Sequence, residues 1–98
     1  MTKILKNKIL KFINNSEYKE SISAIYLFGS YARGEEKKNS DIDLLIQYTK
    51  GSKLSLFDHV KIQKKLSEEC NKDIDLIEKG SVNKYLKKYI NKDLEKIY

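Results

Sequence analysis

The sequence predicts a single α/β (or α+β) domain in which a small mixed sheet of three strands is flanked by helices. Three observations predict it. The 98 residues suffice for one modest hydrophobic core. The chain has no proline, no internal repeat and no low-complexity linker that would mark a boundary. Its apolar residues follow the order helix, strand, strand, helix, strand, helix. We therefore expect one domain over residues 1–98.

The first half of the chain is expected to form a helix, a buried strand, a short helix, a charged loop and a second strand. Thr2 can cap the first helix, and the Asn-Asn-Ser sequence at residues 14–16 ends it. The apolar positions of that helix are Ile4, Leu5, Ile9, Phe12 and Ile13. The other four elements are expected at residues 22–28, 30–33, 34–40 and 41–48.

The second half is expected to form a long helix, a third strand and a last helix. The long helix covers residues 55–70 and ends at Asn71-Lys72, and the strand covers residues 73–77. The buried face of the long helix is expected to carry Leu56, Val60, Gln63, Leu66 and Cys70. After Gly80, Ser81 can cap the last helix. The apolar face of that helix is expected to carry Val82, Leu86, Tyr89, Ile90, Leu94 and Ile97.

Composition argues against several classes of protein. The net charge of +6 comes from lysines scattered along the chain rather than from a basic block interleaved with aromatic residues, so direct nucleic-acid binding is not favoured. No apolar run approaches the roughly 20 residues that span a bilayer, and the N-terminus lacks the apolar centre of a signal peptide. Cys70 has no second cysteine to pair with, which suits a small helix-face residue in a reducing cytoplasm.

A turn at residues 29–34, Gly-Ser-Tyr-Ala-Arg-Gly, follows the first strand. Gly29 has no Cβ, so a ligand can approach the backbone closely there. If Ser30 begins a short helix, backbone N–H groups and the Ser30 hydroxyl can meet an anion, and the Arg33 guanidinium lies one turn further on. Gly-Ser alone is a common turn pair. Its position before an arginine and upstream of paired carboxylates favours phosphate binding.

Asp41 and Asp43 open the second strand and would project on the same face. An isolated Asp-x-Asp is usually a solvated strand end, but two carboxylates held this close repel unless they share a proton or bind a cation. Magnesium on a nucleotide phosphate suits them, because it prefers hard oxygen ligands. The third strand repeats the pattern with Asp73 and Asp75, and alternation alone does not choose between these two. Asp75, flanked by apolar residues, is expected to lie deeper and to complete a three-carboxylate site.

These motifs together resemble the minimal nucleotidyltransferases of the DNA polymerase β-like nucleotidyltransferase superfamily. The resemblance covers roughly residues 2–98 and rests on Gly29-Ser30, Arg33-Gly34, Asp41-Ile42-Asp43 and Asp75 in that order. It implies the minimal nucleotidyltransferase fold, two magnesium ions, and attack of an acceptor hydroxyl on the α-phosphate of ATP with release of pyrophosphate. By resemblance, Asp41, Asp43 and Asp75 are catalytic and metal-binding, Gly29 and Ser30 hold the triphosphate, and Arg33 assists at the phosphates or stabilises the loop.

The resemblance also implies a partner. Minimal nucleotidyltransferases of this kind are typically encoded beside HEPN-domain ribonuclease toxins, and the family's antitoxins transfer AMP to a toxin tyrosine. We therefore expect a type VII-like antitoxin that neutralises a HEPN toxin in this way. Two alternatives stay open. One is neutralisation by binding alone, with a vestigial site, although the aspartates and the Gly-Ser pair are intact. The other is transfer to a small-molecule hydroxyl, as in the kanamycin-modifying enzymes.

Other polar and aromatic residues have more ordinary interpretations. His59 has no second histidine or cysteine at ligand spacing, which indicates a surface or partly buried helix residue rather than a general base. Tyr31 and Tyr48 are candidates to border the cleft. The charged residues 35–39 form a solvated loop, with a lid or a partner contact as alternatives.

Overall fold

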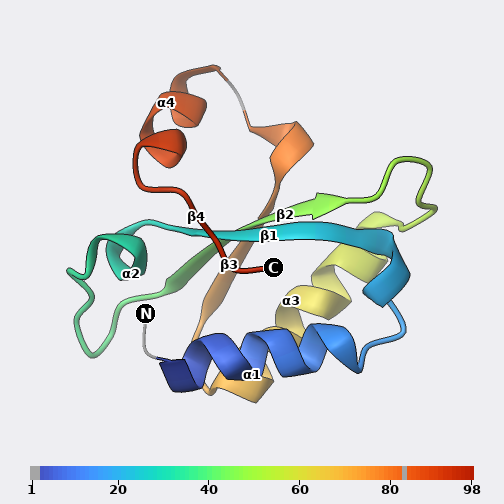
Figure 1. Ribbon diagram of the computed structural model, residues 1–98, viewed down its shortest axis with the longest axis horizontal. Coiled ribbons are helices and arrows are strands. Elements are labelled where there is room, and N and C mark those ends of the chain that lie inside the picture. Colours follow the sequence, from blue (N-terminus) through green and yellow to red (C-terminus); the bar gives the residue numbers. More distant parts are fainter. Residues whose placement is uncertain (1–2, 83) are drawn as a thin grey trace.

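The computed structural model describes residues 3–82 and 84–98. Four strands form one sheet in the order β3-β2-β1-β4, with β2 and β3 parallel and the other pairs antiparallel. Figure 1 shows α1 and α3 on one side of the sheet and α4 on the other. The strands are β1 (Ile22–Phe28), β2 (Ile42–Tyr48), β3 (Ile74–Glu78) and β4 (Glu95–Lys96). The helices are α1 (Lys3–Asn14), α2 (Ser30–Arg33), α3 (Leu56–Cys70) and α4 (Lys84–Lys92).

The core lies between the sheet and the α1–α3 layer. Alternate residues of β2, namely Ile42, Leu44 and Ile46, are fully buried and share one face of the strand. Buried residues of both helices belong to the same cluster: Ile9, Ile13, Ile62, Leu66 and Cys70. The other face of β2 carries Asp43 and Gln47 on either side of the buried Leu45.

The elements that carry the expected motifs are confirmed. The first strand and the short helix have the expected bounds, and β2 begins one residue later than expected, at Ile42. The long helix is capped by Ser55, whose hydroxyl accepts a hydrogen bond from the Asp58 N–H (3.3 Å) while the Asp58 carboxylate accepts one from the Ser55 N–H (2.9 Å). Asn71 ends it in the left-handed conformation, with φ of 49°.

The C-terminal expectation was wrong in two respects. Ser81 does not cap the last helix, because it belongs to a 3₁₀ turn, η2 (Lys79–Ser81), and α4 begins at Lys84. Val82, Leu94 and Ile97 are not on that helix either. Val82 precedes α4, and the chain after Lys92 leads into a fourth strand beside β1. The Ile97 N–H donates to the Ile25 carbonyl at 2.9 Å, and the Ile25 N–H donates to the Tyr98 carbonyl at 3.2 Å. The open edge of β1 thus offered hydrogen bonds that outweighed the helical spacing.

The expected buried faces of the helices also need correction. Ile4, Leu56 and Val60 are 70%, 77% and 56% exposed, whereas Ile62 and Leu66 are fully buried. On α3, the half-buried His59 occupies the inward position of the first turns, and its ring bonds to the sheet. Thr2 and the side chains of Leu86 and Tyr89 lie outside the described residues. Cys70 is buried on the inner face, as expected. Within residues 3–82 and 84–98, each helix is too short or too polar to cross a membrane.

Candidate active site

Gly29 brings the turn after β1 against the carboxylate of Asp43. Its φ of 77° and ψ of −156° lie in a region that only glycine adopts readily. A Cβ added at Gly29 would overlap Asp43 Oδ2 and lie 3.0 Å from Asp43 Cγ. The candidate phosphate turn and the second aspartate of the Asp-x-Asp motif, 14 positions apart in sequence, are therefore in contact.

The short helix α2 is built on that turn. The Gly29 carbonyl accepts hydrogen bonds from the N–H groups of Ala32 (3.1 Å) and Arg33 (3.2 Å), and Gly34 ends the helix with φ of 71°. Ser30 is its first residue and is half-buried. Tyr31 is only 4% exposed and packs in the core, so the interpretation that it borders the cleft was wrong. Tyr31 instead anchors the one-turn helix to the body of the protein.

The strand register places Asp43 opposite Asp75. β2 and β3 pair in parallel with Asp43 and Asp75 as partners, so both side chains leave the same face of the sheet. Asp41 lies just before β2 and is exposed. Burial raises the pKa of the Asp43 carboxyl, the negative charges of Asp75 and Asp41 raise it further, and Arg33 lowers it. The electrostatics therefore couple all three expected carboxylates.

Asp75 is exposed, contrary to the expectation that it lies deeper than Asp73. Its neighbours Ile74 and Leu76 are each 4% exposed and point to the core face, so the strand alternates as predicted. The burial differs because β3 is an edge strand. Asp73 precedes β3 and lines a separate hollow with Ser67 and other residues of the α3–β3 connection. Register, rather than depth, favours Asp75 as the third carboxylate.

The donor set suits magnesium, although the ligands are not gathered. Three carboxylates supply hard oxygen atoms. The repulsion from Asp75 and Asp41, which adds to the effect of burial in raising the pKa of Asp43, is what a cation between the three would relieve. Among the described residues, no group of three or more His, Cys, Asp or Glu side chains is already close enough to hold a metal ion.

Arg33 is engaged by two carboxylates. Its Nε donates to Glu35 Oε2 at 2.9 Å and its Nη1 donates to Asp93 Oδ2 at 3.1 Å, and the two hydrogen bonds raise the pKa of the guanidinium. The first contact orders the start of the loop after α2, and the second ties α2 to the segment that follows α4. Sequence reasoning missed Asp93, because no spacing rule connects residues 60 positions apart.

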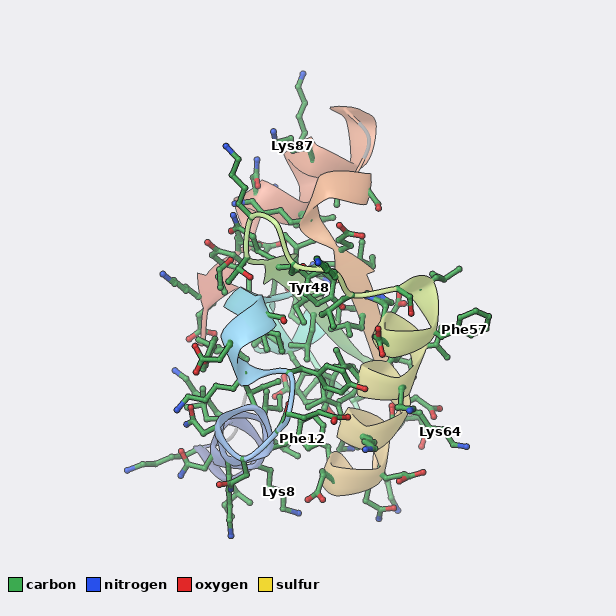
Figure 2. The ribbon with its side chains drawn as sticks, turned by 90° about the vertical axis from the view of Figure 1, so that its right-hand side faces the viewer. Lys8, Phe12, Tyr48, Phe57, Lys64 and Lys87 are labelled. Carbon is green, nitrogen blue, oxygen red and sulfur yellow. The ribbon has the colours of Figure 1, made fainter. Side chains whose placement is uncertain are left out.

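His59 and Tyr48 belong to a different part of the structure. The Leu76 carbonyl can only accept, so His59 Nε2 carries the proton that it donates there (2.9 Å), and Nδ1 accepts from the Tyr48 hydroxyl (2.7 Å). Burial raises the pKa of Tyr48 to about 12, so the phenol stays protonated at neutral pH. Tyr48 ends β2, at the opposite end of the strand from Asp43, and does not border the carboxylates. His59 is partly buried, as predicted. Figure 2 shows the Tyr48 side chain inside the molecule and the Phe57 side chain of α3 pointing outward from the molecule.

The structure thus brings together the Gly-Ser turn, the one-turn helix α2 and aspartates of two parallel strands, the features from which the sequence predicted a nucleotidyltransferase. A family model described as "Polymerase beta, Nucleotidyltransferase" matches residues 7–98, and the chain belongs to this family. It is 43% identical over 88 residues to "Putative protein adenylyltransferase MJ1217" of Methanocaldococcus jannaschii, a match that covers 89% of this chain and 82% of that protein. The protein is thus an enzyme of the nucleotidyltransferase class, as its motifs predicted.

Solved structures agree on the fold. A crystal structure of a toxin–antitoxin with AMP-PNP superposes with a TM-score of 0.76 at 28% identity, covering 95% of this chain and 72% of that one. The complex of a tri-AMPylated Shewanella oneidensis HEPN toxin with an MNT antitoxin superposes with a TM-score of 0.72 at 24% identity, covering 100% of this chain and 72% of that one. Because the identity to the S. oneidensis complex is lower, that similarity supports the fold alone. The minimal nucleotidyltransferase fold is confirmed, with four strands instead of three.

Proposed function

We propose that this protein transfers AMP from ATP to a tyrosine hydroxyl of a HEPN-type toxin and so neutralises it in the cytoplasm, with magnesium as cofactor. The observation that carries the proposal is the meeting of Gly29, Asp43 and Asp75 at one end of the sheet. The name of the M. jannaschii relative supports transfer of AMP to a protein. The toxin–antitoxin complex with AMP-PNP supports both an ATP-like substrate and a toxin partner.

The chain's own residues divide the work as follows. The backbone of Gly29 and the hydroxyl of Ser30 hold the triphosphate beside Asp43, and the missing Cβ of Gly29 leaves room for the Asp43 carboxylate to lie against this turn. Arg33 binds Glu35 through Nε and Asp93 through Nη1, so in this structure it stabilises the loop, and its assistance at the phosphates is the second role that we assign to it. Asp41, Asp43 and Asp75 would hold the metal, with Asp41 and Asp75, both exposed, turning toward Asp43. Bound magnesium supplies positive charge that offsets the charge of the triphosphate.

The reaction needs one bond made and one broken. The tyrosine oxygen attacks the α-phosphorus, the bond to the bridging oxygen breaks, and pyrophosphate leaves. A tyrosine hydroxyl has a pKa of about 10, so its proton must be accepted as the oxygen attacks. Asp75 lies on the solvent-exposed edge strand, where an incoming partner can reach it, and we assign it that proton.

The test uses the protein encoded by the neighbouring gene and ATP labelled at the α-phosphate. We expect label on the partner, and at least about 100-fold less label with Asp41→Asn/Asp43→Asn, because charge stabilisation and positioning carry this chemistry. Asp73→Asn is the matched control, since it removes a nearby carboxylate from outside the site, and it should leave labelling intact.

Label on a small molecule instead would favour the antibiotic-modifying alternative. Inhibition of the partner without label would favour binding alone. Transfer that survives in the double variant would refute the metal assignment.

A further inference from the structure

Within residues 3–82 and 84–98, β3, which carries Asp75, has one backbone edge without a strand partner. In this part of the chain it lies at the end of the sheet and pairs only with β2. The Ile42 N–H donates to the Asp73 carbonyl at 2.9 Å, and the parallel register then directs the backbone groups of Asp75 toward β2. The N–H and C=O groups of Ile74 and Leu76 must point the other way, to the open edge. These two residues flank Asp75 on either side.

Two side chains of α3 bond to that open edge. Ser67 Oγ accepts a hydrogen bond from the Ile74 N–H at 3.2 Å, and His59 Nε2 donates one to the Leu76 carbonyl at 2.9 Å. Ser67 is fixed in turn, because its hydroxyl donates to the Gln63 carbonyl at 3.0 Å. The helix therefore holds the strand by its backbone on both sides of Asp75.

His59 extends the connection to the strand that carries Asp43. Its Nδ1 accepts a hydrogen bond from the Tyr48 hydroxyl at 2.7 Å, and the two rings meet edge to face with centroids 5.9 Å apart. Tyr48 is the last residue of β2. One imidazole thus links both aspartate-bearing strands from the side opposite the carboxylates. The Asp75 side chain is exposed, but the backbone on either side of it is bonded to α3.

We propose that His59 and Ser67 are positioning residues for Asp75, which hold edge strand β3 so that its carboxylate stays opposite Asp43. This inference rests on the proposed function for its effect on catalysis, but not for its effect on the strand. It explains why the histidine faces the sheet at a position where an apolar residue would be expected. A leucine there would bury the Leu76 carbonyl without a donor.

The first test measures the strand in the protein without nucleotide or metal. His59→Leu should raise amide exchange in β3 about tenfold and leave β1 unchanged, because the two hydrogen bonds that are lost join His59 to β3 and to the Tyr48 hydroxyl at the end of β2, and neither involves β1. His59→Gln keeps an N–H donor at a similar reach and is the matched control, with exchange close to that of the unaltered protein. Ser67→Ala removes the hydroxyl that accepts from the Ile74 N–H, so it should raise amide exchange at Ile74 as His59→Leu does in β3. Thermal unfolding monitored by circular dichroism establishes that each variant is folded. Unchanged β3 exchange in folded His59→Leu would overturn the inference.

The second test asks whether the strand's position matters to the carboxylate. Magnesium is titrated while the Asp75 carboxyl carbon is followed by NMR, and we expect about 10-fold weaker apparent affinity in His59→Leu but not in His59→Gln. In the unaltered background, His59→Leu should lower the transfer rate by a similar factor. In the Asp75→Asn background, His59→Leu should lower the rate no further, because the carboxylate that it positions is already gone. An equal loss on both backgrounds would show a general structural role and contradict the inference. Absence of transfer by the unaltered protein would instead overturn the proposed function, with exchange and metal titration still deciding this one.

Discussion

At the scale of single residues, the position of the Asp43 carboxylate is one of the reasons why residue 29 is a glycine. Glycine is required twice at position 29, by its backbone conformation and by the carboxylate that occupies the space of a Cβ. The sequence motif predicted the glycine and the aspartate separately. It did not predict their contact, because the loop between them has no periodicity from which a path can be inferred.

Gly29→Ala should therefore abolish nucleotidyl transfer, because its Cβ would displace the Asp43 carboxylate. Gly34→Ala is the control: φ is also positive there, at 71°, but a Cβ would meet nothing within 4 Å. The control should lose about 1 kcal/mol of stability and keep its activity. Urea unfolding and the labelling assay measure the two effects. Equal activity in the two variants would show that the Gly29–Asp43 contact does not serve catalysis.

Asp43 itself should destabilise the protein that lacks a cation. Burial, Asp75 and Asp41 raise the pKa of its carboxyl above the ordinary 3.8. A carboxyl with a raised folded-state pKa contributes stability below its unfolded pKa, and that contribution is lost as pH rises through the folded value. At neutral pH, Asp43→Asn should therefore raise the melting temperature while it abolishes transfer. Asp73→Asn, measured beside it in calorimetry without metal, should show neither effect. A lower melting temperature for Asp43→Asn would contradict the repulsion argument.

At the scale of elements, the sequence predicted best where a local signal marks each end. The long helix has Ser55 and Asp58 at its start and a left-handed Asn71 at its end, and its expected bounds agree with α3. The inner face was less predictable. Apolar spacing favoured Leu56 and Val60, whereas the structure turns His59 inward to bond with β3. A hydrogen bond between distant elements leaves no trace in hydrophobic periodicity.

Ser55→Ala tests the start of α3. Loss of the Ser55 hydroxyl removes one half of the reciprocal cap and should cost about 1 kcal/mol at neutral pH. The bonds from Ser55 lower the pKa of Asp58, so the cap stabilises the fold above the unfolded value of 3.8 and weakens as pH falls. The difference between the variant and the unaltered protein should shrink below that pH. Urea unfolding at neutral and acid pH measures it, and a pH-independent difference would contradict the role of the ionised carboxylate.

At the scale of the whole molecule, the C-terminal segment returns to the phosphate turn. β4 pairs Glu95 with Leu27 and Lys96 with Tyr26, directly before the turn begins. Asp93 binds Arg33 on the far side of that turn. The expected three-stranded sheet omitted this closure, because a two-residue strand is too short to show alternation. The four-stranded sheet therefore braces β1 on both edges where it leads into Gly29.

The packing of Ile97, rather than the Arg33–Asp93 ion pair, should hold this segment in place. Ile97 is 7% exposed and belongs to the main core, so Ile97→Ala should cost about 2–4 kcal/mol. The Arg33 side chain is 42% exposed, and ion pairs in such positions contribute little to stability, so Asp93→Asn should cost far less than Ile97→Ala. Lys96→Ala, at an exposed neighbouring position, should be close to neutral. Urea unfolding of the three variants ranks them. If Asp93→Asn were the most destabilising, the segment would be held by charge, and its attachment should then weaken with added salt.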